Sequence, residues 1–401
     1  MELLVLSHKP CWPSAEAASG FATDGGFPFQ MGALSQLFEK TTLLLPHRRS
    51  PAPKGLTPLA GHELRVSPLP EPPGLGLRRK LALLIWFPRH LPNLWRQVGH
   101  ADAVHAAVPG DLGTLGLLLA LIRKKPLLVR HCGTWGNRTT LADRFLAWLL
   151  PRIAGGRNVV LATGGDAAPP EPRYPAVQWI FSTSLSRKEM NEIPISSPWQ
   201  PGRPLRLVTV GRLSRGKNTR ACLSALSLIR NHYPEAHLEV VGAGPCRAEL
   251  ESMAKDLDLL DAVTFHGNLS HPGVLDALCR SHIFLFPTRT AEGFPKAALE
   301  ALACGLPVVA PPVSVLRLLL EEGCGALLEA PEGKQVANAV LSLTADPERL
   351  GRISSQARKT AQRYTLEGWQ DLIGESLFAA WKWRRKAQLT TEDLQQEAEH
   401  V

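Results

Sequence analysis

The sequence contains little tyrosine and no closely spaced cysteine pair. Only three of its 401 residues are tyrosine, and no RRM, KH or zinc-finger pattern occurs, so the usual features of a nucleic-acid-binding protein are missing. The seven cysteines are scattered without a Cys-x-x-Cys pair, which argues against a structural zinc site. An odd and dispersed set of cysteines is typical of reduced thiols in a cytosolic protein.

Long apolar runs are also missing. A membrane-spanning helix needs about 20 apolar residues, whereas the nearest candidate, residues 112–122, ends at three basic residues and suits a buried helix better. Residues 1–8 are too short and too acidic at the front for a signal peptide, and they predict a β-strand instead. These features predict a cytoplasmic protein that is soluble or lies peripherally on the inner face of a membrane.

The size and charge of the chain are more informative. A chain of 401 residues is too long for one ordinary core and predicts two domains. Its 44% hydrophobic and 20% charged residues are typical of a globular protein. The formal charge of +9 favours anionic partners such as nucleotide phosphates or an anionic lipid surface.

Two glutamates eight positions apart, Glu292 and Glu300, follow the apolar run 283–287 and precede another at 306–310. They should therefore lie at the carboxyl end of a parallel strand, where open α/β sheets bind ligands. At 100° per residue, the two carboxylates would lie about 80° apart and two turns apart on a helix. One would lie at the helix mouth, where free N–H groups suit an anion, and the other deeper on the same side. The alternative is an ordinary helix with two solvated glutamates.

A basic loop, residues 211–218, follows the predicted strand 205–210 and precedes the predicted helix 219–231. It reads Gly-Arg-Leu-Ser-Arg-Gly-Lys-Asn and lies at the start of the same series of strands and helices. Alternating strands and helices of this length indicate a parallel sheet. Taken alone, the loop could simply be solvated.

Together, these two segments resemble the C-terminal half of family 4 GT-B glycosyltransferases, the group 1 glycosyl transferases. That family has a Gly-Arg-Leu-x-x-x-x-Lys loop and a Glu-x7-Glu motif with this Gly-Phe interior. The resemblance is good over residues 205–375 and looser over 1–195. It implies an α/β GT-B architecture, with two Rossmann-like domains whose parallel sheets face each other across a cleft. It also implies a retaining, hexosyltransferase-type enzyme that moves a sugar from a UDP- or GDP-sugar to a glycan, lipid-linked or small-molecule acceptor.

The resemblance assigns Arg212 and Lys217 to the donor diphosphate. Fixed cations there would stabilise the charge that develops on the leaving group, and an arginine can fork onto phosphate oxygens. Arg215 and Lys296 are further candidate cations.

Glu292 would contact the transferred sugar and Glu300 the ribose hydroxyls. The backbone amides near Gly293 and Phe294 would surround the sugar and phosphate. By position alone, we expect the turn containing His266 and Asn268 to flank the nucleobase.

In the first domain, the loop 9–26 ends in Gly25 and Gly26, whose backbone could approach a phosphate or sugar. The strand 127–131 ends in His131, beside Cys132 and Gly133. The family has a His-Gly or His-x-Gly near this point that contacts the sugar or acceptor. If the alignment slips by one residue, Arg130 is the functional side chain.

We take Glu292, His131, Arg212 and Lys217 as candidate catalytic residues. No residue is placed as a covalent nucleophile, so we expect front-side substitution, in which the departing phosphate helps to deprotonate the acceptor. The fold of the resembled family usually needs no metal, and no cofactor beyond the nucleotide-sugar substrate is expected.

The predicted domains follow from these assignments. They are an acceptor-side domain (1–195), a linker (196–204), a nucleotide-sugar-binding domain (205–365), a helix that crosses back to the first domain (366–386) and a polar tail (387–401).

Two basic segments, 78–80 and 383–386, allow a membrane-associated acceptor. The segment 77–95 is basic and then apolar, which can lie on an anionic membrane, although a core helix with a solvated start is the favoured interpretation. Two alternative functions also stay open: another GT-B enzyme such as an epimerase or phosphorylase, and a non-catalytic nucleotide-sugar-binding scaffold. The particular sugar, acceptor and oligomeric state are not indicated.

Overall fold

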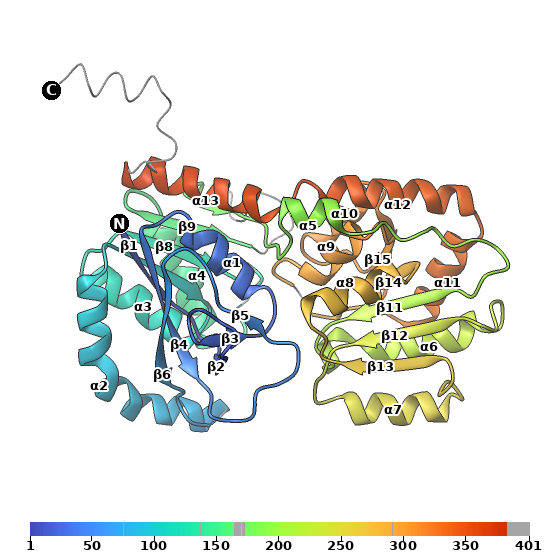
Figure 1. The fold of residues 1–401 in the computed structure, drawn as a ribbon, viewed down its shortest axis with the longest axis horizontal. Coiled ribbons are helices and arrows are strands. Elements are labelled where there is room, and N and C mark those ends of the chain that lie inside the picture. The colour runs from blue at the N-terminus through green and yellow to red at the C-terminus, as the bar shows by residue number, and fades with distance from the viewer. Residues whose placement is uncertain (75, 137, 164–169, 171–172, 291, 383–401) are drawn as a thin grey trace, which may run out of the picture.

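The computed structural model describes residues 1–74, 76–136, 138–163, 170, 173–290 and 292–382. Two parallel sheets stand side by side, each covered by helices (Figure 1). The predicted α/β architecture with two parallel sheets is thereby confirmed. Residues 383–386 of the predicted last helix, with their basic cluster, and the predicted tail 387–401 lie outside the described residues.

The first sheet has seven parallel strands in the order β10-β9-β8-β7-β1-β4-β6. These are β1 (Glu2–Leu6), β4 (Lys40–His47), β6 (Leu64–Pro70), β7 (Ala103–Val108), β8 (Leu127–His131), β9 (Asn158–Ala162) and β10 (Val177–Trp179). Its helices are α1 (Phe27–Ser35), α2 (Gly76–His100), α3 (Asp111–Ile122), α4 (Leu141–Ile153) and α5 (Arg187–Glu192). A small antiparallel sheet adds β2 (Trp12–Pro13), β3 (Phe21–Thr23) and β5 (Thr57–Pro58). The proline-containing strand β6 lies at the sheet edge, because proline has no N–H to donate to a ladder.

The second sheet has six parallel strands in the order β13-β12-β11-β14-β15-β16. These are β11 (Arg206–Val210), β12 (His237–Val241), β13 (Val263–Gly267), β14 (Ile283–Leu285), β15 (Val308–Ala310) and β16 (Gly325–Leu327). Its helices are η1 (Arg215–Lys217), α6 (Thr219–Ile229), α7 (Arg247–Asp256), α8 (His271–Cys279), α9 (Lys296–Ala303), α10 (Leu316–Glu321), α11 (Gly333–Thr344) and α12 (Pro347–Ala361). Most of these strands are buried on both faces, which explains their continuous apolar sequences.

Helix α1 corrects one predicted boundary. The sequence pattern predicts a helix over about 31–39, but the structure begins it at Phe27 and ends it at Ser35. Pro28 lies in the first turn, where its missing N–H costs nothing and its fixed φ suits a helix. Residues 27–29 therefore belong to the helix and not to the preceding loop.

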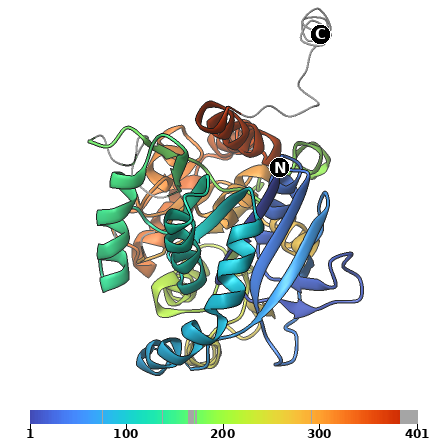
Figure 2. The same ribbon diagram turned by 90° about the vertical axis from the view of Figure 1, so that its left-hand side faces the viewer.

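The last described helix, α13 (Leu366–Trp381), packs against the first sheet's domain (Figures 1 and 2). The Trp381 indole N–H donates to the Arg157 carbonyl oxygen at 2.9 Å, and the Ser376 hydroxyl lies 2.9 Å from the Gln178 side-chain oxygen. By contrast, the predicted linker 196–204 lies against the second domain, where Trp199 is buried in the core. The exact domain boundaries remain a prediction.

Neighbouring side chains on α13 allow a test of this packing. Ile373 is fully buried in a core cluster, whereas Leu372 is 42% exposed. Replacing Ile373 by alanine should lower the free energy of unfolding by about 2–5 kcal/mol, whereas Leu372→Ala should change it by only about 0.5 kcal/mol. Urea unfolding followed by tryptophan fluorescence measures both. Equal losses in the two variants would contradict the described docking of α13.

Candidate active site

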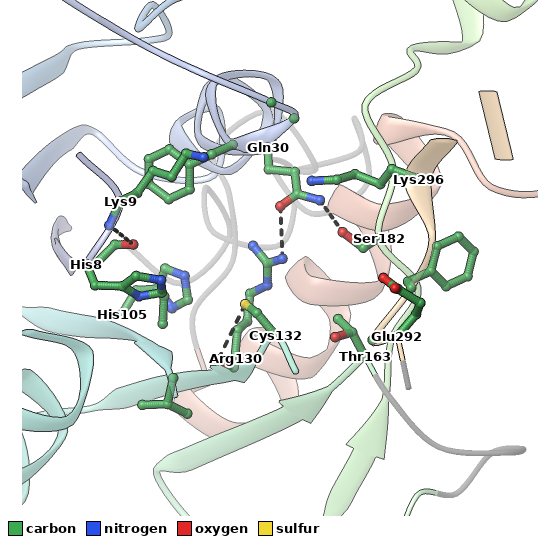
Figure 3. Close-up of a pocket in the computed structure, with 18 residues that line it drawn as sticks. His8, Lys9, Gln30, His105, Arg130, Cys132, Thr163, Ser182, Glu292 and Lys296 are labelled. Atoms are coloured by element: carbon green, nitrogen blue, oxygen red, sulfur yellow. Dashed lines mark hydrogen bonds between the residues drawn. The ribbon is translucent and has the colours of Figure 1, made fainter. Parts of the chain in front are cut away.

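A cleft runs between the carboxyl ends of the strands of the two sheets, and two adjoining cavities occupy it. The inner cavity has a volume of about 330 Å³ (Figure 3). Most of its wall comes from the first domain, including the ends of β1, β7 and β8 and the start of α1, and the rest comes from the loop before α9 and the first residue of that helix. The outer cavity, about 710 Å³, lies between the loop after β1 and the loops that follow β11, β12 and β13. His8, Lys9 and Gly25 line both cavities.

Lys217 and Glu292 form an ion pair beside the inner cavity, which Glu292 lines and Lys217 does not. The Lys217 ammonium lies 2.6 Å from Glu292 Oε1, and the two side chains are only 25% and 17% exposed. The same carboxylate oxygen accepts longer hydrogen bonds from the hydroxyls of Thr288 and Thr290, at 3.3 and 3.4 Å. The ammonium also lies 4.9 Å from the ring centroid of Phe286. The structure therefore joins the basic loop directly to the glutamate motif.

The two motif glutamates do not share a helix, which corrects the predicted angular relation. Helix α9 begins at Lys296 with Pro295 as its N-cap, so Glu292 lies in the preceding loop, at the helix mouth, and only Glu300 lies on the helix. Glu300 is buried, and its Oε1 accepts a 2.5 Å hydrogen bond from the Ser184 hydroxyl. It lines neither of the two cavities.

Gly293 lies where only glycine fits. A Cβ at this position would lie 2.8 Å from the Cys132 carbonyl oxygen and 3.1 Å from the Thr163 hydroxyl oxygen, both on the first domain. The next side chain, Phe294, is buried against the rings of Phe181 and Tyr364, at centroid distances of 6.3 and 5.6 Å. The glycine thus brings the loop close to β8, and the phenylalanine anchors it.

Arg212 is exposed and lines the outer cavity, whereas Lys217 lies deeper. Arg215 is exposed in the short helix η1. Asn218 holds this loop in place: it adopts a left-handed conformation (φ 57°) and donates from Nδ2 to the carbonyl oxygens of Pro287 and Pro331. Asparagine tolerates that conformation better than most residues.

The two residues expected beside the nucleobase lie apart. Asn268 lines the outer cavity. His266 does not line it: its Nε2 lies 3.3 Å from Oε2 of Glu239, on the neighbouring strand β12. Of the two, only Asn268 therefore lines a cavity of the cleft.

Gly25 and Gly26 line the inner cavity, and their contact with a ligand stays a prediction. A Cβ on Gly26 would lie 2.9 Å from the Lys296 ammonium, so the glycine leaves room for that side chain. Lys9 forms an ion pair with Asp24 at 2.6 Å beside the same loop.

At the end of β8, Arg130 and Cys132 line the inner cavity, whereas His131 does not. Successive side chains of a strand point to opposite faces. The His131 ring packs edge-on against Trp135 at 5.3 Å, and burial lowers its pKa. Of the two alternatives that the sequence leaves open, the structure brings Arg130 to this cavity.

Several cavity residues were not predicted from the sequence, namely His8, Lys9, Gln30, His105, Thr163 and Ser182. Three of them follow or end strands of the first sheet (His8, Lys9 and Thr163), a position that could have identified them. No motif marks Gln30 or Ser182. Among the described residues, no cluster of three or more His, Cys, Asp or Glu side chains could hold a metal ion.

Comparison with known proteins adds a family to this geometry. Residues 194–360 match the model of the family described as glycosyl transferases group 1. The chain carries the sequence pattern of this family over these residues, which include both motifs. It is a GT-B glycosyltransferase that uses a nucleotide-sugar donor, which favours glycosyl transfer over the epimerase, phosphorylase and scaffold alternatives.

One curated relative and two solved structures illustrate these similarities in sequence and in fold. The chain is 28% identical over 312 residues, 69% of its length and 77% of the relative's, to a GDP-mannose-dependent alpha-(1-6)-phosphatidylinositol dimannoside mannosyltransferase of Mycobacterium tuberculosis. Its fold resembles Anabaena HepE in complex with UDP and glucose, with a TM-score of 0.70, 18% identity and coverage of 94% of this chain and 100% of HepE. It also resembles sucrose-phosphate synthase of Thermosynechococcus elongatus, with a TM-score of 0.71, 18% identity and coverage of 95% and 100%.

Gly293 allows a test of the cleft geometry. Replacing Gly293 by alanine should push the loop away from β8, and a shift of about 1 Å in an active site can cost about a hundredfold in rate. We therefore expect donor turnover, measured as nucleotide release, to fall by at least about tenfold. Gly351→Ala is the control, because a Cβ there meets nothing within 4 Å. Normal turnover in Gly293→Ala would show that the close approach is not needed.

Proposed function

We propose that this glycosyltransferase transfers a hexose with retention of anomeric configuration, from a UDP- or GDP-sugar to a glycan, lipid-linked or small-molecule acceptor. The observation that supports the proposal most is the meeting of Lys217, Glu292 and the Gly293 loop with the ends of β1 and β8 at one cleft. GDP-mannose is the first donor to test, because the mycobacterial relative is named as GDP-mannose-dependent. UDP-glucose is the second, because HepE was crystallised with UDP and glucose.

The nucleotide would lie in the outer cavity, with its diphosphate toward Arg212 and Lys217. Arg212 is exposed there and forms no ion pair within the described part of the chain, so its guanidinium is available to phosphate oxygens. The Lys217 ammonium is already paired with Glu292. Because an ammonium has three N–H donors, it could also donate a hydrogen bond to a phosphate of the ligand.

The transferred sugar would lie in the inner cavity, where Glu292 can accept hydrogen bonds from ring hydroxyls. We retain Glu300 as the residue that contacts the ribose. In that case the ribose hydroxyls would have to compete with the Ser184 hydroxyl, from which the Glu300 carboxylate accepts a hydrogen bond in this structure.

Transfer would proceed on one face of the sugar. The bond between the anomeric carbon and the phosphate oxygen breaks, and a bond to the acceptor oxygen forms on the same side. The acceptor proton passes to the departing phosphate. Arg212 and Lys217 would stabilise the charge on the leaving phosphate.

Nucleotide binding tests the donor site. We expect GDP or UDP to raise the melting temperature of the protein, because a ligand at 100 times its dissociation constant adds about 2.7 kcal/mol of stability. The double variant Arg212→Ala/Lys217→Ala should lose this shift. A matched double variant, Arg352→Ala/Lys359→Ala, removes two exposed cations of α12 and should keep it. No shift with GDP, UDP or ADP at several millimolar would contradict the proposed donor site.

We also propose that the protein acts at the cytoplasmic face of an anionic membrane, with α2 as the contact. Leu84 and Ile85 are 70% and 77% exposed on this helix, Leu81 is 59% exposed, and Arg78 and Arg89 are exposed nearby. Helix α2 contains no acidic residue. Apolar and basic side chains together favour an anionic lipid surface. Within the described residues, no helix has the length and apolar character needed to span a bilayer.

Vesicle sedimentation tests this contact. The protein should bind vesicles that contain phosphatidylserine better than pure phosphatidylcholine vesicles at low salt. Leu84→Ser/Ile85→Ser should weaken binding at least about tenfold, since a buried leucine-sized side chain contributes about 1.5–3 kcal/mol. The control Leu228→Ser/Leu260→Ser alters two exposed leucines of the second domain and should bind normally. If the parent protein ignores anionic vesicles, the membrane contact is wrong.

A further inference from the structure

The inner cavity contains a buried arginine without a carboxylate partner. Arg130 is 3% exposed, and its guanidinium Nη2 donates to the neutral Gln30 Oε1 at 3.0 Å. Its Nε is buried without a hydrogen-bond partner. The guanidinium carbon lies 4.6 Å from the ring centroid of Trp369. Among the described residues, no carboxylate forms an ion pair with it.

A second cation, Lys296, also lines the inner cavity. In Figure 3 the side chains of Arg130 and Lys296 point toward Gln30 from different sides. Lys296 forms no hydrogen bond or ion pair with any other described residue. Its pKa is lowered to about 8, mainly by burial and next by the nearby Lys9, and Glu300 opposes this shift.

The remaining charged groups of the cavity already have partners. Lys9 is paired with Asp24, and Glu292 with Lys217. The two histidines of the wall add no positive charge at neutral pH, because burial lowers the pKa of His8 and, to about 3, the pKa of His105. The uncompensated charge of the cavity is therefore that of Arg130 and Lys296.

Two helices also begin at this cavity. Gly26, the N-cap of α1, and Lys296, the first residue of α9, both line it. Neither helix has an acidic residue in its first turn or a side-chain cap. Free N–H groups and the positive end of a helix dipole favour a bound anion.

A buried guanidinium without a counter-charge is costly, and arginine does not lose its proton to escape the cost. We propose that Arg130 and Lys296 bind an anionic group, a phosphate or carboxylate, carried by the acceptor. This inference rests on the proposed function, which places the donor nucleotide at Arg212 and Lys217. Arg130 and Gln30 belong to the first domain, on the acceptor side of the cleft, and Arg212 lines only the outer cavity. The acceptor is therefore an anionic molecule.

Inorganic phosphate is the probe, and it is added to protein already saturated with GDP or UDP at pH 7. We expect it to bind this complex and to raise its melting temperature further. In Lys296→Met, phosphate affinity should fall by about tenfold or more, because a charge-assisted contact is lost. The control Lys359→Met, an exposed cation of α12, should leave it unchanged.

Two further variants keep the test independent of folding. Lys296→Arg retains the charge and should retain phosphate binding. Arg130→Lys keeps a positive charge but loses the planar guanidinium, which can donate two parallel hydrogen bonds to one phosphate. It should therefore weaken phosphate binding while the nucleotide still binds. Lys296→Met should be at least as stable as the parent without ligand, because it removes a buried charge.

The outcomes separate this inference from the proposed function. If Lys296→Met weakens GDP or UDP binding itself, and phosphate no longer binds once nucleotide is present, the subsite belongs to the donor and the inference is wrong. If nucleotide binds normally but neither phosphate nor acetate, added as the carboxylate probe, has any effect on the complex, the anionic acceptor is also excluded. If neither nucleotide binds, the proposed donor site fails independently of this subsite.

Discussion

The close approach of the loop before α9 to the end of β8 is the contact on which the rest of the cleft depends. Gly293 can lie against the Cys132 carbonyl only because it has no side chain, and Phe294 holds it there within an aromatic cluster. That cluster includes Tyr364, just before the helix that returns to the first domain. The same few residues therefore close the cleft and join the two domains.

Charge in the cleft is divided between the two sheets. On the second domain, Arg212 lines the outer cavity and Lys217 pairs with Glu292, where a nucleotide diphosphate would replace water, whereas Lys296 reaches the inner cavity. On the first domain, the buried guanidinium of Arg130 donates to neutral Gln30 and has no carboxylate partner among the described residues. Such an arrangement lowers stability in the free protein, and a bound anion would restore it. The cost is typical of a site that is arranged for a ligand and not for the fold.

Much of the second domain could be predicted from the sequence, because strand, loop and helix follow one another with short connections and continuous apolar strands. The parallel sheet and the proximity of residues 211–218 to Glu292 follow from that pattern. The start of α9 was missed although Pro295 marked it, since proline favours the beginning of a helix. Whether β8 presents Arg130 or His131 to the inner cavity depends on which face of the sheet borders the cavity. Gln30 lies on a helix without a motif, and only tertiary packing brings it to Arg130.

The most direct test of the central claim is proton NMR of donor turnover by the pure protein, with GDP-mannose and UDP-glucose in separate experiments and water as the acceptor. Both donors carry an α-linked sugar, so retention predicts that the free sugar appears first as the α-anomer and equilibrates later. First release of the β-anomer would contradict retention. Binding of both nucleotides without consumption of either sugar donor would contradict the assignment of these two donors to the cleft.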